Sequence, residues 1–524
     1  MIDSKDFLVE IGTEELPPKA LPTLIKSFAQ EIQRGLDSAE LSFAEVHEYA
    51  APRRLAVWVE GVATRQADKQ IERRGPAVAA AFDAEGNPSK AAQGFARSCG
   101  VEVDQLARME TAKGSWLCFR AEQKGASATD LLPEIVSNAL AKLPIPKRMR
   151  WGSRDTEFVR PVHWVILLQD NQVIPAQVMG ITADNKTRGH RFHHPEALEI
   201  SQPARYAEQL KDEGYVIADF SERRATIRHQ VETLAMAQGG TAVIDAALLD
   251  EVTALVEWPV ALAGKFDEAF LDVPHEALIA TMQDNQKYFP LVSASGGLMA
   301  RFITVANIES SDPETVIEGN ERVIRPRFSD AVFFWEQDRK QTLASRVEAL
   351  KTVLFQKQLG TLYDKTLRIQ QLAAFVATQI GADQVDAERA AWLSKCDLLS
   401  DMVNEFPKLQ GIAGRYYAQH DGEAEAVALA LDEQYLPRHA GDDLPAGGIA
   451  QALAIADKID TVVGIFGIGQ KPSGTRDPFG LRRASLGILR ILIEKDLDLD
   501  LKALIEKARS ELGDRIEDPD VVIH

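Results

Sequence analysis

Two groups of carboxylates in the C-terminal half of the chain have spacings that would suit metal ligands. Asp397, Asp401 and Glu405 recur at every fourth residue, and Asp457 and Asp460 lie three residues apart in a later segment. On a helix, like charges at these spacings repel one another unless a positive charge faces them. A divalent cation could supply that charge, so the pattern raises the question of a metal-dependent catalytic site.

Apolar residues around the first group predict the helix that would position it. They recur at helical period and form one stripe, which is typical of a helix packed against a core. The stripe consists of Trp392, Cys396, Leu399, Val403 and Phe406. We therefore predict a helix over Ala387–Phe406 that carries the carboxylates on a different face.

The same residues resemble the ligand pattern of HD-type hydrolytic domains, in which a His-Asp pair is followed by a later Asp. Here Cys396-Asp397 stands where the His-Asp pair would be, and Asp457 suits the later position. A neutral imidazole is the usual nitrogen ligand of such ions, whereas a cysteine on an apolar stripe is more often a core residue. His420 and His439 lie in predicted loops. Because the ligand set is incomplete, we predict a degenerate scaffold without a bound metal.

A degenerate scaffold still needs positive charge near its carboxylates. We expect basic side chains such as Arg415 or Lys458 to lie near them in place of an ion. The alternative is a metal-dependent phosphohydrolase that uses Asp397, Asp401 and Asp457. Metal analysis and a nucleotide-hydrolysis assay would distinguish the two.

Other patterns of catalytic or nucleotide-binding residues are missing from the sequence. It contains no Gly-x-Ser-x-Gly motif, no Gly-x-x-x-x-Gly-Lys-Ser/Thr loop and no strand–Gly-x-Gly-x-x-Gly–helix unit. The histidine-rich segment at residues 190–194 lacks the i, i+4 spacing of a helical metal site. We predict a polar loop packed with rings there, with phosphate contact through Arg188 and Arg191 as the alternative. We therefore expect no catalytic residue and no nucleotide pocket in this chain.

Composition narrows the class of protein. At 524 residues the chain is too long for one core, and three or four domains are expected. Hydrophobic residues make up 45% and charged residues 26%, as in ordinary globular proteins, and three cysteines cannot build a disulfide framework. The sequence has no run of about 18 apolar residues and no signal peptide, so we expect a cytoplasmic protein without a membrane span.

The distribution of arginine is more informative than the net charge. A net charge of −19 argues against a nonspecific nucleic-acid binder, but basic residues gather in local clusters, several beside Pro, Gly or an aromatic residue. The clusters are Arg53/Arg54, Arg73/Arg74, Lys147/Arg148/Arg150, Arg188/Arg191, Arg322/Arg325/Arg327 and Arg476/Arg482/Arg483. One such cluster is typical of an ordinary surface. Several of them on an acidic protein favour RNA, because guanidinium groups suit phosphate oxygens and aromatic rings can stack on unpaired bases.

Hydrophobic periodicity predicts a multidomain α+β protein, with a mixed α/β N-terminal half followed by an all-α HD-like domain. In the N-terminal half we expect strands at Phe7–Gly12 and Leu55–Val59, helices from Leu21 and at Leu131–Leu143, and a loop-rich stretch from Arg73. In the C-terminal part we expect helices at Asp330–Glu348, Leu362–Ile380, Ala387–Phe406, Ile449–Val463 and Leu481–Glu494. The predicted domains are 1–150 (α+β), 151–320 (β-rich α+β) and 321–524 (all-helical, HD-like).

Long stretches of the sequence resemble one known family, the β subunit of the bacterial two-subunit glycyl-tRNA synthetase. The resemblance is carried by Leu8–Pro17, Val323–Ala331, Lys395–Gly411 and Lys471–Arg483, the last being the most specific. These stretches occur in the family's order, and the resemblance covers nearly all of the chain. It implies a cytoplasmic ligase that joins glycine to its tRNA using ATP.

The resemblance also implies partners. The family forms a heterotetramer of two α and two β subunits, in which the α subunit carries the aminoacylation site and uses ATP and Mg²⁺. No cofactor is therefore expected in this chain. The β subunit recognises tRNA(Gly) and contains an HD-like domain without known hydrolytic work. The family's anticodon-binding domain should follow His524, so we expect a truncated chain that lacks it.

For tRNA binding we expect two basic surfaces. One consists of Arg476, Arg482 and Arg483, and the other of Lys147, Arg148, Arg150, Arg188 and Arg191. The degenerate HD-like positions would be Cys396, Asp397 and Asp457, with no metal. An alternative from a different class is a non-catalytic assembly scaffold that only holds the α subunit, and tRNA binding by the isolated chain would exclude it.

Overall fold

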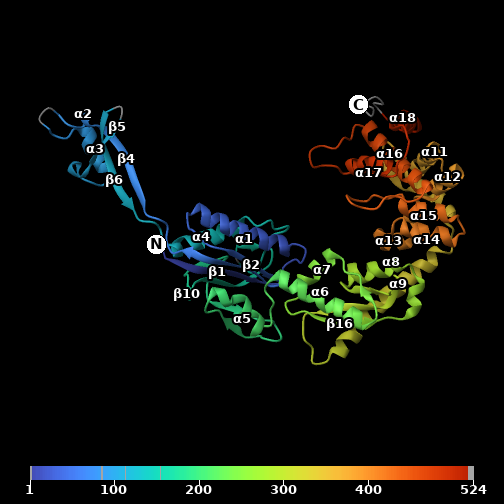
Figure 1. Cartoon of the computed structure of the whole chain (residues 1–524), viewed down its shortest axis with the longest axis horizontal. Helices are drawn as coiled ribbons and strands as arrows, with labels where there is room; N and C mark the ends of the chain where they lie inside the picture. Colours follow the sequence, from blue (N-terminus) through green and yellow to red (C-terminus); the bar gives the residue numbers. More distant parts are fainter. Residues whose placement is uncertain (1–2, 84–85, 112–113, 154, 517–524) are drawn as a thin grey trace. The chain divides into compact units, whose positions relative to one another are not determined.

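A computed structural model describes the chain at residues 3–83, 86–111, 114–153 and 155–516. It divides into two compact units, and Figure 1 colours the chain from its N-terminus in blue to its C-terminus in red. Unit 1 consists of Met1–Leu234, Ile244–Leu262 and Val305–Pro313, and unit 2 of Ala235–Val243, Ala263–Thr304 and Glu314–His524. The predicted sequence of a mixed α/β half followed by a helical C-terminal part is confirmed. The boundaries at residues 150 and 320 stay a prediction.

An antiparallel five-stranded sheet organises unit 1, in the order β10-β9-β1-β3-β2. Its strands are β1 (Ser4–Thr13), β2 (Val46–Ala51), β3 (Arg54–Ala63), β9 (Val162–Gln169) and β10 (Gln172–Val173). β1 is central, and Val9 lies opposite Val57 of β3 and Leu167 of β9. Residues Phe7–Ile11 are apolar except for the buried Glu10, because both faces of the strand are buried.

The two faces of this sheet belong to different cores. α1 (Leu21–Ser38) and α4 (Ala128–Ala141) pack together on the face that carries Val9 and Ile11. The opposite face carries Leu8 and packs against α5 (Tyr206–Asp212). The predicted strands in this sheet and the two predicted helices are confirmed, with ends displaced by a few residues.

A separate three-stranded sheet corrects the prediction of a loop-rich stretch from Arg73. It has the order β4-β6-β5, with β4 (Lys69–Ala77), β5 (Ala107–Thr111) and β6 (Gly114–Gln123), and α3 (Lys90–Ser98) packs against it. Arg73 and Arg74 lie within β4, opposite Phe119 and Cys118. Gly75 and Pro76, which follow the arginine pair, produce only a register shift near the end of β4 and do not end the strand.

The histidine-rich segment lies in the connection of a short hairpin in unit 1. The hairpin strands are β13 (Lys186–Arg188) and β14 (Ala197–Glu199), and residues 190–194 form neither helix nor strand. The ring of His193 stacks on Tyr215 at 5.0 Å, and its Nε2 accepts a hydrogen bond from the Glu309 backbone N–H. The predicted loop packed with rings is therefore confirmed.

A four-stranded sheet and a long helix precede the helical part of the chain. The sheet has the order β15-β17-β18-β16, with β15 (Thr241–Ala242), β16 (Val260–Lys265), β17 (Phe289–Val292) and β18 (Leu298–Ala306). The helix α9 spans Pro313–Asp338, so the predicted helix at Asp330–Glu348 is wrong at both ends. Of the predicted residues beyond α9, 339–348, only Leu343–Arg346 is α-helical, as α10.

The C-terminal helices surround one large apolar core. They are α11 (Leu362–Ile380), α12 (Gln384–Leu393), α13 (Asp401–Glu405), α14 (Ile412–His420), α15 (Glu425–Glu433), α16 (Gly448–Gly467), α17 (Leu481–Glu494) and α18 (Leu501–Leu512). The bounds predicted for α11 and α17 are confirmed. No described helix is long and apolar enough to cross a membrane.

The helix predicted over Ala387–Phe406 is broken in the structure. α12 ends at Leu393, a 3₁₀ turn covers Cys396–Leu399, and α13 starts at Asp401. The hydroxyl of Ser400 accepts a hydrogen bond from the Val403 N–H and caps the new helix. The carboxylate of Asp338 accepts further bonds from the Asp401 and Met402 N–H groups, at 3.0 and 2.9 Å. The three carboxylates therefore do not share one helical face.

Candidate functional site

The acidic residues of α16 lie in a network filled by lysine and arginine. Asp457 contacts the Lys365 Nζ with Oδ1 at 3.0 Å and the Lys395 Nζ with Oδ2 at 3.2 Å. Asp460 contacts the same Lys365 Nζ at 3.0 Å and accepts a hydrogen bond from the Arg368 Nε at 2.6 Å. Three cations thus hold two carboxylates.

Helix packing explains how this network is built. α11 packs against α16, and residues three apart lie on one helical face. Lys365 and Arg368 therefore face Asp457 and Asp460. Burial alone would raise the pKa of Asp457, but the charges of Lys365 and Lys395 outweigh it and hold that pKa below its usual range. The positions that suggested metal ligands thus carry ammonium groups of the protein itself.

Asp397 lies outside this network and has a different environment. It is 2% exposed, and its Oδ2 accepts a hydrogen bond from the Gly411 N–H at 2.6 Å. Burial raises its pKa to about 6, although the Gly411 bond and the charge of Lys395 limit the rise. Burial likewise raises the pKa of the neighbouring Cys396 thiol to about 12, which makes it a core residue and not a reactive thiolate.

The basic residues observed beside the acidic positions differ from the two that were predicted from the sequence, Arg415 and Lys458. Arg415 pairs with Asp432 at 2.8 Å and with Glu276 at 3.0 Å, so its prediction as a partner of the Asp397 carboxylate line is wrong. Lys458 donates to the backbone carbonyls of Gln434 and Leu436, and burial lowers its pKa to about 8. Lysines 365 and 395 have the predicted role, and spacing in the sequence does not single them out.

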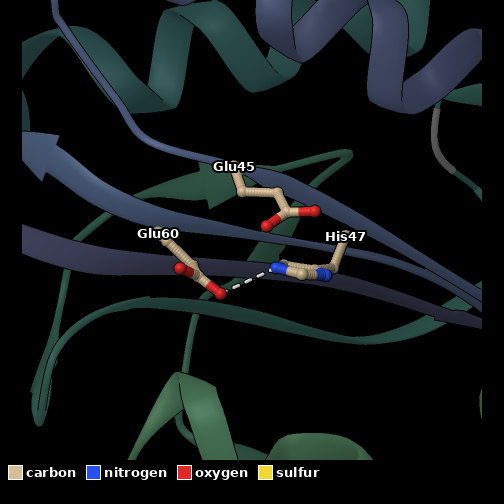
Figure 2. A group of neighbouring side chains, drawn as sticks. All are labelled: Glu45, His47 and Glu60. Atoms are coloured by element: carbon tan, nitrogen blue, oxygen red, sulfur yellow. Dashed lines mark hydrogen bonds and ion pairs between the residues drawn. The ribbon is translucent and has the colours of Figure 1, made fainter.

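One group of described side chains in unit 1 has the geometry to hold a metal ion: Glu45, His47 and Glu60 (Figure 2). One ligand atom from each lies within 4.8 Å of the others. His47 already contacts Glu60, with its Nε2 2.8 Å from Oε1, and its ring stacks on Trp58 at 4.4 Å. The imidazole is therefore partnered without an ion, and an ordinary cross-strand cluster is the simpler interpretation. This group could not be predicted from the sequence, because it depends on the register of β2 and β3.

The proposed tRNA-binding residues are all exposed side chains. In unit 1, Arg150 pairs with Glu157 at 2.7 Å, and Arg191 lies 3.5 Å from Glu14. Lys147 and Arg148 precede Arg150 in the chain, and Arg188 ends β13. In unit 2, Arg476 lies in the turn before α17, and Arg482 and Arg483 lie in its first turn. No described hydrogen bond or ion pair joins the Lys147–Arg150 group to Arg188 or Arg191.

The Arg53/Arg54 cluster is not a surface pair. Arg54 is fully buried and contacts Glu10 at 3.1 Å and Glu257 at 3.4 Å. Its Nη2 also donates to the Arg188 carbonyl at 2.6 Å. Burial alone would lower the pKa of Arg54, but the two carboxylates outweigh it and raise that pKa. Arg54 is therefore a structural residue, and Arg53 is only partly buried.

Comparison with known proteins decides the family. A family model described as the glycyl-tRNA synthetase beta subunit matches residues 7–522. The chain belongs to the glycyl-tRNA synthetase β-subunit family. Membership makes it a subunit of an aminoacyl-tRNA synthetase, which is a ligase, and confirms the family predicted from the four signature stretches.

Curated relatives of this family match nearly the whole chain. The glycine–tRNA ligase beta subunit of Hahella chejuensis is 59% identical over 513 residues, which cover 98% of this chain and 74% of the relative. That of Marinobacter nauticus is 58% identical over 506 residues, covering 96% and 73%. That of Citrobacter koseri is 56% identical over 521 residues, covering 99% and 76%. These findings favour neither the phosphohydrolase nor the scaffold alternative.

Proposed function

We propose that this chain is the tRNA-recognising subunit of a glycine–tRNA ligase and acts with an α subunit that carries the aminoacylation site. The family match over residues 7–522 carries this proposal. The proposed assembly is a cytoplasmic heterotetramer of two α and two β subunits. ATP and Mg²⁺ would be used at the α subunit, and this chain would hold no cofactor.

The proposed tRNA contacts are exposed basic residues on an acidic protein. In unit 2 they are Arg476, Arg482 and Arg483, and in unit 1 Lys147, Arg148, Arg150, Arg188 and Arg191. Their exposure supports the proposal, because a guanidinium can bind phosphate oxygens only where the nucleic acid can reach it. The net charge of the whole chain is −19, so the rest of its surface would repel RNA and restrict binding to these basic residues.

We further propose that the helical part is a degenerate HD-like domain with Cys396, Asp397 and Asp457 at the former ligand positions. The contacts of Lys365 and Lys395 with Asp457 support this interpretation. A divalent ion at Asp457 would have to displace two buried ammonium groups, and Lys395 would then lose its carboxylate partner, whereas Lys365 would keep Asp460. The phosphohydrolase alternative therefore lacks an available carboxylate at its central position.

The proposed tRNA surface in unit 2 is tested by charge reversal. The double variant Arg482→Glu/Arg483→Glu should bind tRNA(Gly) roughly tenfold or more weakly in the presence of the α subunit, because each lost charge-assisted hydrogen bond costs about 1.5–3 kcal/mol. The slope of log K against log salt should become shallower by about one for each arginine that contacts a phosphate. Filter binding at several salt concentrations measures both quantities.

Lys502→Glu is a suitable control because Lys502 is exposed on α18 in the same unit, 4.0 Å from Glu506. It should leave the affinity for tRNA and the salt slope almost unchanged. Affinity that is equal in the wild type and the double variant, with the fold intact by circular dichroism, would exclude this surface. Absence of tRNA binding by the wild-type chain together with the α subunit would contradict the proposed function itself.

A further inference from the structure

Unit 2 contains a cavity of about 590 Å³ beside the lysine network. Four segments line it: residues 407–410, 434–438, 457–461 and 477–484. Its volume lies within the usual range for small-molecule sites of roughly 300–1,000 Å³. The sequence predicted no nucleotide pocket, because these segments meet only in the folded chain.

The charged side chains around the cavity favour an anion. Four cations line it, namely Lys408, Arg438, Lys458 and Arg483, against two carboxylates, Asp457 and Asp477. Asp457 already forms ion pairs with Lys365 and Lys395. Asp477 accepts hydrogen bonds from the backbone N–H groups of Leu481 and Arg482 at 2.9 and 3.0 Å. Asp477 keeps its negative charge, and Lys408 is paired with Asp284 at 2.7 Å. Lys458, Arg438 and Arg483 still leave the lining with an excess of positive charge, on a chain whose net charge is −19.

Two arginines at the cavity can bind further partners. The Arg483 Nη1 donates to the Arg438 carbonyl at 3.4 Å, and no ion pair of Arg483 is found within the described residues. Arg438 shares the Asp432 carboxylate with Arg415, with contacts of 3.1 and 2.8 Å. A guanidinium that shares its carboxylate or has none keeps donors for a phosphate group.

An aromatic ring at the same cavity extends the chemistry beyond a bare phosphate. Phe479 lines the cavity and is 38% exposed, so its ring is accessible to a ligand there. The ring of Tyr435 also lines the cavity, and the Lys395 Nζ lies 4.8 Å from the centre of that ring. An exposed ring beside arginine is the arrangement that stacks an unpaired base while its phosphate is held.

We infer that this cavity binds a single nucleotide, with its phosphate at Arg438 and Arg483 and its base against Phe479. The occupant is either a free nucleotide or an unpaired nucleotide of RNA, and both have the same chemistry. Binding of an RNA nucleotide rests on the proposed function, because it would make the cavity part of tRNA recognition. Binding of a free nucleotide does not depend on the proposed function.

The test measures two affinities of the full chain, one for AMP by calorimetry and one for tRNA(Gly). Phe479→Ala and Arg483→Glu are the test variants, and Lys502→Glu is the control for charge. If the occupant is a free nucleotide, both test variants should weaken AMP binding roughly 5- to 150-fold, as for loss of a stacked base. Adenosine and pyrophosphate, which each lack one half of the ligand, should bind more weakly than AMP.

The affinity for tRNA(Gly) shows whether the occupant is a free nucleotide or a nucleotide of RNA. Weaker tRNA binding in Phe479→Ala, together with displacement of AMP by tRNA(Gly), would identify an RNA nucleotide as the occupant. Weaker AMP binding with unchanged tRNA binding in Phe479→Ala would identify a free nucleotide, because Arg483→Glu is expected to weaken tRNA binding in either case. If Phe479→Ala changes neither affinity while its thermal midpoint matches the wild type, the inference is wrong. That result would leave the proposed function intact, provided that the wild type binds tRNA.

Discussion

Each unit of this molecule contains a buried charge network, and the two networks are built differently. In unit 1, Arg54 lies between Glu10 and Glu257, with all three side chains at most 2% exposed. In unit 2, Lys365 and Lys395 hold Asp457, whose side chain is 16% exposed and lines a cavity. The first network is closed on all sides, and the second is open on one.

Because of this difference, we assign a structural role to the Arg54 network and a binding role to the lysine network. The Arg54 guanidinium joins β3 to β1 and, through the Arg188 carbonyl, to β13. Its planar guanidinium has donors in fixed directions, which suits permanent contacts within the folded protein. The lysines of unit 2 leave a positively charged wall where another group can bind. Buried charge alone therefore does not mark a binding site, whereas buried charge beside an accessible cavity does.

The largest expected effect comes from opening the closed network. Arg54→Met should destabilise unit 1 by about 3–5 kcal/mol, because it leaves Glu10 and Glu257 buried without their cation. Asp457→Asn should destabilise unit 2 by only about 1–3 kcal/mol, because water in the cavity can hydrate the lysines and Asp460 still holds Lys365. Hydrogen exchange in β1 and β3, compared with α11 and α16, measures the two losses separately.

A second variant keeps this comparison informative if Arg54→Met fails to fold. Adding Glu10→Gln should restore part of the stability, because it removes one of the orphaned charges. Equal losses in Arg54→Met and Asp457→Asn would mean that the two networks do not differ in the way described.

An intermediate effect is expected for Asp397, a buried carboxylate of unit 2 that forms no ion pair with any described residue. Its pKa in the folded chain is about 6, above the value of about 3.9 for an unfolded chain. The folded state therefore holds the proton more tightly, so this stabilisation is full below about pH 4 and is lost as the pH rises through about 6. Asp397→Asn should gain about 2–3 kcal/mol relative to the wild type between about pH 4 and pH 7.

Urea unfolding at a series of pH values measures this shift. Asp401→Asn provides the matched control, because Asp401 lies on an exposed position four residues away. A difference between Asp397→Asn and the wild type that does not change with pH would contradict the role assigned to burial.

The smallest effect is expected at the exposed group of Figure 2. The side chains of His47 and Glu60 are 28% and 38% exposed, so His47→Ala should change the free energy of unfolding by about 1 kcal/mol or less. We expect added Zn²⁺ to leave the thermal midpoint of the wild type unchanged. A rise in the wild type that disappears in His47→Ala would show a metal site there.

Local signals in the sequence were sufficient for individual helices. α11 begins at a capping box made by Thr361 and Asp364 and ends at Gly381, whose φ of +73° is the left-handed conformation that glycine favours. Its apolar period and both end signals agree, so its bounds could be predicted. The break after Leu393 could not, because it depends on Asp338, which reaches its partners from a distant part of the chain.

The candidate sites were harder to predict for the same reason. The doublet Arg53-Arg54 reads as a basic cluster, yet only the strand pairing of β3 decides that Arg54 is buried. Lys365 and Lys395 are separated from Asp457 by many residues, and the packing of α11 on α16 brings Lys365 to it. Sequence resemblance found the family because it compares long ordered stretches and does not depend on knowing these contacts.

The carboxylate of Asp338 gives the helical region a mechanical property. This last residue of α9 bonds to the N–H groups at the start of α13, to the Tyr417 hydroxyl of α14 at 2.8 Å, and to Arg346 at 3.0 Å. α9 therefore cannot slide along its axis without either breaking these bonds or pulling α13 with it. The residues that follow α13, Pro407 and Lys408, line the cavity. A force on α9 would thus reach the cavity wall through the Asp338 carboxylate and α13.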